Sequence, residues 1–232
     1  MQLNNLSFNI SHNVLNLGLT CSCFIISDLR NRETDAGFEV IKEQVIKEVL
    51  SELSPEKIKN AHVLCGFKEL HKSIGCSNRK NIAASENLLK LLWQHGRLPH
   101  VNLLVDIYNL VSIKTMLALG AHDTAKITGS IHLRFTNGTE KFWPIGGTGY
   151  KTVASGEYAY VDEENDIICR LEVRQVEKTK VTLDTKGCFY IVQGNANTDS
   201  NYIKNATEEL IALTKRFCGG QEQMLYMPWM ER

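Results

Sequence analysis

One segment restricts the fold more than any other, because it is almost continuously apolar and yet carries polar side chains at a helical spacing. It runs from Asn102 to Asp123 and reads NLLVDIYNLVSIKTMLALGAHD. Residues 102–119 predict a helix that is buried on nearly all sides. Asn102, Asp106 and Asn109 fall within about 60° of one another on such a helix. Because an unpaired buried carboxylate or amide costs several kcal/mol, the fold or a ligand must satisfy these groups.

This polar stripe has two interpretations. The first is a structural network that ties the helix to loop backbone, with Asp106 as the helix-to-loop tether. The second is the polar floor of a pocket, where amide and acid groups hydrogen-bond a ligand. His122, near the end of the segment, is a candidate acid or base near neutral pH.

The rest of the chain predicts helices first and strands afterwards. Helical spacing and capping residues indicate helices over 34–53, from Ser54-Pro55, from Ser85 to Gly96 and over about 200–217. Short β-rich runs occur at FIIS (24–27) and, after Asp123, at KITGSIHLRF, TNGTEKFWPI, GEYAYVD, DIICRLEVRQ and GCFYIVQG. Asn137-Gly138 predicts a two-residue hairpin turn between two of these runs.

This order predicts an α+β fold with a helix-rich N-terminal half. Its core is expected to be a mostly antiparallel sheet, or a barrel-like one, flanked by helices. We expect a single domain over residues 1–232, with an N-terminal strand and helix part at 1–65 and a core module at 66–220.

The composition excludes several classes of protein. Lys+Arg and Asp+Glu balance at 26 each, so a tight non-specific binder of DNA is not expected. The seven cysteines are scattered and odd in number, which favours reduced thiols. No segment resembles a signal peptide or a membrane span, and we expect a cytoplasmic protein. No metal site and no other cofactor are predicted, because His95 and His100 lack further ligands and the glycines at 146–149 lack a nucleotide-binding lysine.

Polar residues at the ends of the β runs are the other candidates for a site. Glu157 lies in a turn between two runs, and Arg174, Gln175 and Glu177 follow the next one. Solvated strand faces explain the same pattern equally well. A local basic patch lies between Phe67 and Asn81, and it contains Lys68, Lys72, Arg79 and Lys80 together with His71. This patch is either a contact for a few phosphates or an ordinary solvated connector.

Three stretches together resemble a known family: LPHVNLLVDIYNLVSIKTMLALGAHD, GEYAYVD and CRLEVRQVEKTKVTLDT. They resemble the tRNA-editing module of the bacterial phenylalanyl-tRNA synthetase β-subunit, and specifically its free-standing relatives. The similarity spans roughly Gly66 to Gly220 and is strongest at Asn102, Asp106 and Asn109, closing on Asp123. The resemblance implies a mixed α/β module whose pocket receives the 3′ end of an aminoacyl-tRNA.

In that family the synthetase module hydrolyses tyrosine wrongly attached to phenylalanine tRNA. Free-standing relatives act in trans, and one clears canavanine from arginine tRNA. Two positions depart from the synthetase pattern. Gly120 stands where the synthetase module has a pocket histidine, and His122 follows two residues later. Glu177 falls at the position of a pocket glutamate, counting back from Asp184-Thr185.

The resemblance implies a trans-editing hydrolase that removes a mischarged amino acid, without ligase activity, metal or covalent nucleophile. Glu157, Glu177 and His122 are then the expected catalytic groups, and Asn109, Ser112, Arg174 and Gln175 the expected substrate contacts. Lys68, Lys72, Arg79 and Lys80 would touch the acceptor stem of the tRNA. Two alternatives stay open: a module of the same fold that binds tRNA or an amino acid without turnover, and an amidase or esterase for a small amino-acid derivative. The sequence leaves the amino acid, the tRNA and the oligomeric state open.

Overall fold

The computed structural model describes residues 6–230 of the chain. The helices are α1 (His12–Leu15), α2 (Ala36–Glu52), α3 (Pro55–Asn60), α4 (His62–Ser73), α5 (Ala84–His95), α6 (Leu103–Thr115) and α7 (Ser200–Cys218), with a 3₁₀ turn at Thr124–Lys126. The strands are β1 (Phe8–Ile10), β2 (Cys21–Ser27), β3 (Ala118–Asp123), β4 (Ile131–Phe135), β5 (Tyr158–Val161), β6 (Ile167–Arg170), β7 (Arg174–Gln175), β8 (Cys188–Gln193) and β9 (Gln221–Tyr226).

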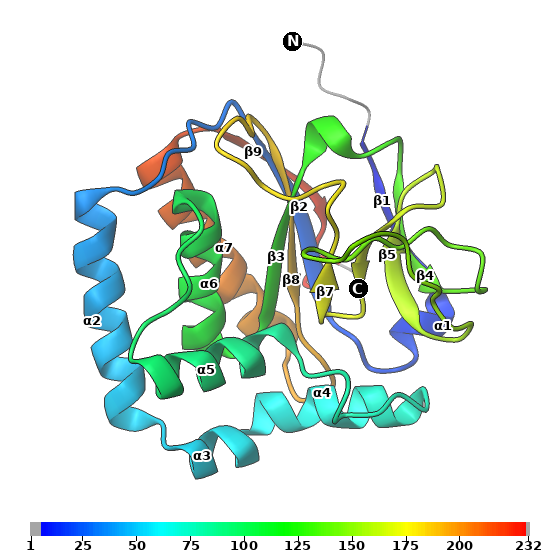
Figure 1. Ribbon diagram of the computed structural model, residues 1–232, viewed down its shortest axis with the longest axis horizontal. Coiled ribbons are helices and arrows are strands. Elements are labelled where there is room, and N and C mark those ends of the chain that lie inside the picture. The colour runs from blue at the N-terminus through cyan, green and yellow to red at the C-terminus, as the bar shows by residue number, and fades with distance from the viewer. Residues whose placement is uncertain (1–5, 231–232) are drawn as a thin grey trace.

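The strands form two sheets. The first has four strands in the order β3-β8-β2-β9, and the second has five in the order β1-β4-β5-β6-β7. All pairings are antiparallel except that of β1 with β4. Figure 1 shows α2, α6 and α7 on one side of the four-stranded sheet and the five-stranded sheet on the other, with α1 beside β4. The predicted α+β class, with a mostly antiparallel core flanked by helices, is confirmed, and the sheets are open.

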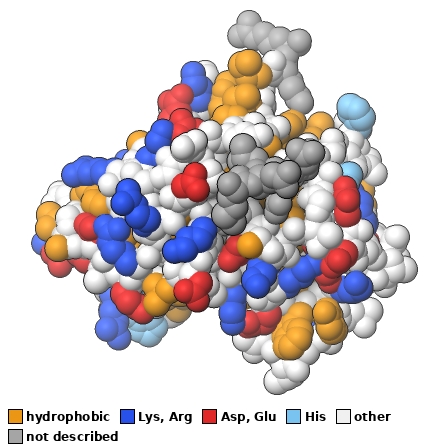
Figure 2. Space-filling model, turned by 90° about the horizontal axis from the view of Figure 1, so that it is seen from above, with side chains coloured by type: hydrophobic (Ala, Val, Ile, Leu, Met, Phe, Trp, Pro, Cys, Tyr) orange, Lys and Arg blue, Asp and Glu red, His pale blue; other side chains and the backbone are white. Residues whose placement is uncertain are grey.

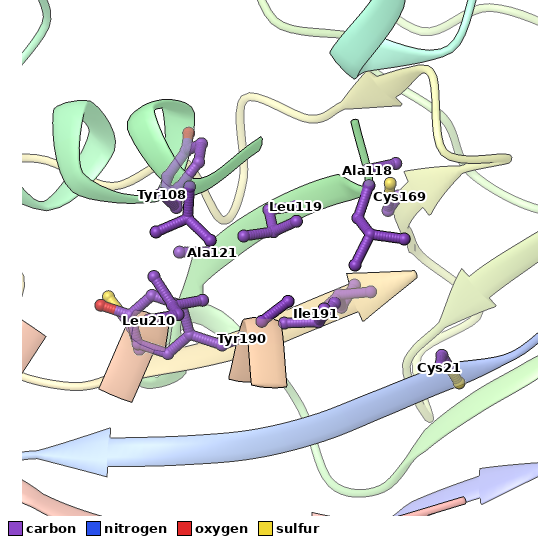
Figure 3. Packing of buried hydrophobic residues seen from close by; sticks show 14 of the residues in the cluster. Cys21, Tyr108, Ala118, Leu119, Ala121, Cys169, Tyr190, Ile191 and Leu210 are labelled. Atoms are coloured by element: carbon purple, nitrogen blue, oxygen red, sulfur yellow. The ribbon is translucent and has the colours of Figure 1, made fainter. Parts of the chain in front are cut away.

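Strands β2, β3 and β8 of the four-stranded sheet are buried on both faces, and their alternate residues point to different layers. On the helix side, Tyr190 of β8 stacks on Phe24 of β2, with ring centroids 5.0 Å apart. Figure 3 shows Tyr190 beside Leu210 of α7, and α7 packs on β2 and β8. On the other side, Phe189 of β8 meets Phe8 of the five-stranded sheet at 6.1 Å. Aromatic rings therefore join the two sheets into one core.

The five-stranded sheet also separates two environments. Tyr158 and Tyr160 of β5 are fully buried on its inner face, toward the four-stranded sheet. Its outer face carries a separate small apolar cluster, which consists of Phe142, Val153, Ala159, Val161, Ile167 and Val176. The segment between β4 and β5 supplies two members of this cluster and so covers the outer face.

The sequence signals at the helix ends are realised in the structure. The Asp35 side chain accepts hydrogen bonds from the backbone amides of Gly37 and Phe38 and so caps α2. Ser54 caps α3, which begins at Pro55, and α5 ends at Gly96 in the left-handed conformation with φ 67°. The predicted strand at 24–27 lies within β2.

The predicted helix over 102–119 is too long. Helix α6 ends at Thr115, Met116 takes a left-handed conformation with φ 59°, and β3 begins at Ala118. The apolar run continues across this boundary because β3 is buried along its whole length and pairs with β8. Periodicity cannot separate a buried helix from a buried strand. His122 therefore lies on a strand inside the core.

Two further expectations were wrong. Asn137-Gly138 does not join two paired strands, because β4 pairs with β5 across residues 136–157, and Asn137 lacks the positive φ that the turn requires. The run at 141–145 instead makes isolated bridges to Asp166 and Val176. Helix α4, which covers part of the basic stretch 67–81, was not predicted because this stretch was interpreted only by its charges, although five of the twelve residues of the helix are buried.

The polar stripe on α6 is structural at its first two positions. The Asn102 side chain caps the helix by accepting from the Val105 amide at 3.2 Å. Asp106 accepts from Lys42 of α2 at 2.9 Å, from the Val101 amide at 3.2 Å and pairs with His100 at 2.8 Å. The predicted tether between helix and loop is confirmed, and no ligand is needed to satisfy this carboxylate.

The surface and the cysteines agree with the composition. Figure 2 shows basic and acidic side chains interspersed on the face seen there, without a broad field of one sign. The seven cysteines are free thiols, five of them buried. Within residues 6–230, none of the helices combines the length and hydropathy of a membrane span.

Candidate functional site

A small cavity lies between the two sheets, at the end where β7 approaches β3. Its volume is about 40 Å³, which gives room for roughly three water molecules or a short side chain. The lining residues are Ala84, Ala118, Leu119, Gly120, Tyr160, Cys169, Glu172, Val173, Arg174, Gln175, Ile191 and Gln193. Figure 3 shows Ala118, Cys169 and Ile191 approaching one another in this part of the core. Polar groups converge here inside an otherwise apolar wall, which is the usual composition of a ligand site.

Glu172 is the buried carboxylate of the cavity. It lies in the tight turn between β6 and β7, where Leu171 takes the left-handed conformation with φ 52°. A non-glycine residue holds that conformation at a cost of about 1–3 kcal/mol, and such positions cluster at functional sites. The turn is fixed by hydrogen bonds from Leu171 to the Tyr158 carbonyl and from Val173 to the Arg170 carbonyl. These contacts direct Glu172 into the core, where its side chain is 1% exposed.

His71 of α4 lies beside this carboxylate. Its Nε2 lies 2.5 Å from Glu172 Oε1, and its side chain is also 1% exposed. Its Nδ1 lies 3.2 Å from the Asn78 side-chain oxygen. Burial lowers the pKa of His71, but the hydrogen bond and charge of Glu172 outweigh burial, so the pKa lies above its ordinary value. Glu172 therefore favours the protonated form of His71, and both side chains of the pair are held out of water.

The second oxygen of Glu172 joins a chain of polar groups on the inner face of the five-stranded sheet. Tyr158 donates its hydroxyl to Glu172 Oε2. Gln193 of β8 donates to the same oxygen at 3.3 Å and accepts from the Tyr160 hydroxyl at 2.8 Å. Burial raises the pKa of both tyrosines well above the ordinary value, so their hydroxyls remain donors. This network locks the position of Glu172 in the cavity wall.

Gly120 and Gln175 meet across the cavity. A Cβ atom added at Gly120 would lie 2.6 Å from Gln175 Nε2, so the glutamine amide occupies the space that a side chain at 120 would need. His122 lies behind this contact, with Nδ1 2.9 Å from Thr179 Oγ1. Its Nε2 is buried and, among residues 6–230, has no hydrogen-bond partner. Complete burial lowers the pKa of His122 to about 3, so the ring is neutral at physiological pH.

Arg174 lies at the mouth of the cavity. It is exposed on the short edge strand β7, and within residues 6–230 its guanidinium forms no ion pair. An unpaired arginine beside a cavity can donate to a phosphate or to a developing oxyanion, since its planar fork matches both. The structure therefore brings Arg174 and Gln175, two of the predicted substrate contacts, to one cavity.

The predicted catalytic carboxylates lie elsewhere. Glu157 forms a two-pronged ion pair with Arg170, at 2.5 and 2.6 Å, on the other face of the sheet. Glu177 lies outside on a groove of about 270 Å³ beside Trp143 and Tyr150, where it accepts from the Gly146 amide at 2.8 Å and pairs with Lys180. Their catalytic roles stay predictions, and the structure does not bring these two residues together.

The other predicted contacts have structural surroundings. Ser112 is buried and donates to the Leu117 carbonyl at 2.7 Å, which closes the end of α6. Asn109 is buried, with 8% exposure, on the same helix. Among the predicted tRNA-binding residues, Lys68 donates to the Lys59 carbonyl and approaches Glu86 at 3.6 Å. Lys72, Arg79 and Lys80 are exposed on and after α4, the helix that carries His71.

The largest groove lies away from this cavity. It is an open hollow of about 890 Å³ between α2 and residues 96–100. Charged groups of this groove are already paired, since Lys42 forms ion pairs with Glu39 and Asp106. Size alone therefore does not identify the site, and the convergence of buried polar groups favours the smaller cavity.

Sequence reasoning missed Glu172, His71, Gln193 and Tyr160. Glu172 stands inside the apolar run IICRLEV, and a carboxylate in such a run is the one signal that pointed to a buried polar group. His71 was counted with the basic patch, because a lysine-rich stretch does not reveal which of its cations faces inward.

The fold and the cavity define a class: an α+β module of two facing sheets with a small polar pocket between them. The chain belongs to the B3/4 domain family, whose model matches residues 72–219. This match confirms the resemblance seen in the sequence at the level of the family.

The structure is similar to that of an N-terminal fragment of the phenylalanyl-tRNA synthetase β-subunit from Pyrococcus horikoshii, with a TM-score of 0.52 and 15% sequence identity. The similarity covers 96% of this chain and 51% of that one, so this chain spans about half the length of the fragment. A likeness at this identity shows a shared fold. A comparison with curated protein sequences found no match.

Proposed function

We propose that this protein hydrolyses the ester bond of a mischarged aminoacyl-tRNA and acts in trans, without ligating amino acids itself. Its family membership and the shared fold with a tRNA synthetase fragment support a tRNA-related role. The observation that carries the proposal is the cavity between the sheets, with Glu172 at its floor and Arg174 at its mouth. An aminoacyl group on the 3′ end of a tRNA would enter it side chain first, with the ester at the mouth.

The ester is an activated bond, so a site of this kind can act by positioning and electrostatics without a metal or covalent nucleophile. Arg174 and the Gln175 amide would donate to the oxygen that becomes negative when water attacks the carbonyl. The neighbouring ribose hydroxyl would assist the leaving group. Lys72, Arg79 and Lys80 would contact phosphates of the acceptor stem, which accounts for local binding by a chain without net charge.

The test is a panel of mischarged tRNAs, including non-protein amino acids, incubated with the wild-type protein, Gln175→Ala and Glu177→Gln. We expect hydrolysis of a restricted set of aminoacyl groups, a loss of about tenfold or more in Gln175→Ala, and unchanged rates in Glu177→Gln. Hydrolysis of no member of the panel would refute the proposal.

A non-catalytic module of the same family is the second candidate, and one observation favours it. The polar groups at the floor of the cavity are already paired with one another, so none of them is a free base. The same panel separates the candidates, because a binding module would retain charged tRNA without releasing the amino acid. A small-molecule esterase would prefer free amino-acid esters, and Lys72→Ser with Lys80→Ser would then leave its rates unchanged.

A further inference from the structure

Three groups occupy acceptor positions of Glu172 inside the cavity wall. His71 is 2.5 Å from Oε1, and Tyr158 and Gln193 both donate to Oε2. A carboxylate offers about four acceptor positions. One position is therefore left for a donor from the cavity that Glu172 lines.

The depth of Glu172 determines which part of a ligand would meet it. Arg174 is exposed at the mouth, whereas the Glu172 side chain is 1% exposed. In an aminoacyl-tRNA the ribose and the ester must remain at the mouth of the cavity. The α-amine stays close to them, because it is bonded to the α-carbon, which is attached to the ester carbonyl. The tip of the amino-acid side chain is the part that reaches farthest inward.

Much of the remaining cavity wall is apolar, in contrast to Glu172. Ala84, Ala118, Leu119, Ile191 and Val173 line the cavity with apolar groups, and the volume of about 40 Å³ admits only a short side chain without rearrangement. A short side chain with a hydrocarbon tip would leave the last position of Glu172 buried and unmatched, which is costly.

We propose that Glu172, held by His71, Tyr158 and Gln193, is the specificity-determining residue of the cavity and selects a short aminoacyl side chain that ends in a hydrogen-bond donor. The donor is an amino or hydroxyl group, chosen over a hydrocarbon of the same shape. This inference rests on the proposed function, since it names the substrate class of that site. Glu177, the carboxylate on the outer side of β7, has no part in the selection.

The experiment uses three aminoacyl groups with the same heavy-atom skeleton, chemically charged onto one tRNA: serine, β-aminoalanine and α-aminobutyrate. They differ only in the last atom, which is a hydroxyl, an amine or a methyl group. We expect the wild-type kcat/KM for the two donor-bearing groups to exceed that for α-aminobutyrate by about 100-fold or more, because a site built around a substrate donor rejects the analogue that lacks it. Glu172→Gln should reduce this preference to about tenfold or less, while Glu177→Gln should retain it.

The outcomes are distinguishable. Equal wild-type rates for the three groups would overturn the inference, and so would an equal loss for all three in Glu172→Gln, which would assign Glu172 to the α-amine or to the fold. The wild-type comparison does not depend on the folding of a variant. If no ester is hydrolysed, the proposed function fails, and the inference is then tested by titrating the wild-type protein with the three 3′-aminoacylamino-adenosine amides. Equal affinities in that titration would overturn it.

Discussion

The two faces of the five-stranded sheet use charged residues in opposite ways. On the inner face, one carboxylate and one histidine are sealed between the sheets and joined to tyrosine and glutamine side chains. On the outer face, ion pairs between buried carboxylates and partly exposed cations hold loops in place: Arg170 binds Glu157, Arg134 binds Glu140, and Lys178 holds Asp162 and Asp166. A buried network with a cavity beside it fits a binding site, whereas paired charges at a loop boundary fit a structural role. The difference assigns chemistry to the inner face.

The largest effect on stability is expected on the outer face. Arg170→Met leaves the Glu157 carboxylate, whose side chain is 11% exposed, without its cation. We expect the free energy of unfolding to fall by about 3 kcal/mol, because removing one partner of a largely buried pair strands the other charge. Denaturant titration measures this change.

Selection among the three aminoacyl groups should remain intact in folded Arg170→Met protein, and a loss of that selection would break the assignment of function to the inner face. A stability loss below about 1 kcal/mol would show that the pair is effectively solvated.

The buried side of the four-stranded sheet should respond to acid through His122 of β3. Its pKa is about 3 in the folded protein and about 6.5 in the unfolded chain. The unfolded state therefore binds more protons between these values, and stability falls as the pH falls below about 6.5. Between pH 7 and pH 5 the wild-type protein should lose about 2 kcal/mol more than His122→Gln, as measured by denaturant titration. Parallel pH profiles for the two proteins would contradict the neutral, buried state of His122.

His71 should act in the opposite direction. Its pKa is raised in the folded protein, so its contribution is fully present below the unfolded pKa and is lost as the pH rises through the folded pKa. The stability difference between wild type and His71→Gln should therefore shrink on the alkaline side. A difference that grows with pH would show that the pKa of His71 is not raised in the folded protein.

A smaller effect is expected from Gly120→Ala. The added Cβ meets the flexible end of Gln175, so the glutamine can move without unfolding the sheet. We expect a nearly unchanged Tm and a loss of about tenfold in kcat/KM, since displacement of a positioning group lowers the rate. Unchanged kinetics in a folded variant would show that the Gln175 amide is not part of the site.

The smallest effect is expected from Glu177→Gln. Glu177 is on the outer groove, and its pKa is lowered first by the hydrogen bond with Lys180 and then by that with the Gly146 amide. An exposed pair of this kind contributes little, so neither Tm nor hydrolysis should change measurably. Sequence comparison with the synthetase module predicts a catalytic role for this residue, so a large loss of hydrolysis would restore that prediction and move the site to the outer groove.

Local sequence signals predicted much of the fold but only part of the site. Apolar spacing located α2, the Ser54 cap located the start of α3, and Gly96 located the end of α5, because these signals act within a few residues of the helix. The end of α6 was misplaced because β3 is buried on both faces and its pairing with β8 is not visible locally. Arg174 and Gln175 were predicted because polar residues at a strand end are conspicuous. Glu172 and His71 were missed because their contact joins α4 to the turn after β6, and only tertiary structure brings these segments together.

The proposed function requires the aminoacyl end of the ligand to enter the cavity between the two sheets. The direct test is an NMR titration of the isotope-labelled protein with an adenosine that carries serine on its 3′ carbon through a non-hydrolysable amide bond. The backbone amide chemical shifts are followed during the titration. We expect the largest shifts at residues that line the cavity, namely Gly120, Glu172, Gln175 and Gln193. Shifts confined to the outer groove, at Trp143, Tyr150 and Glu177, would contradict it.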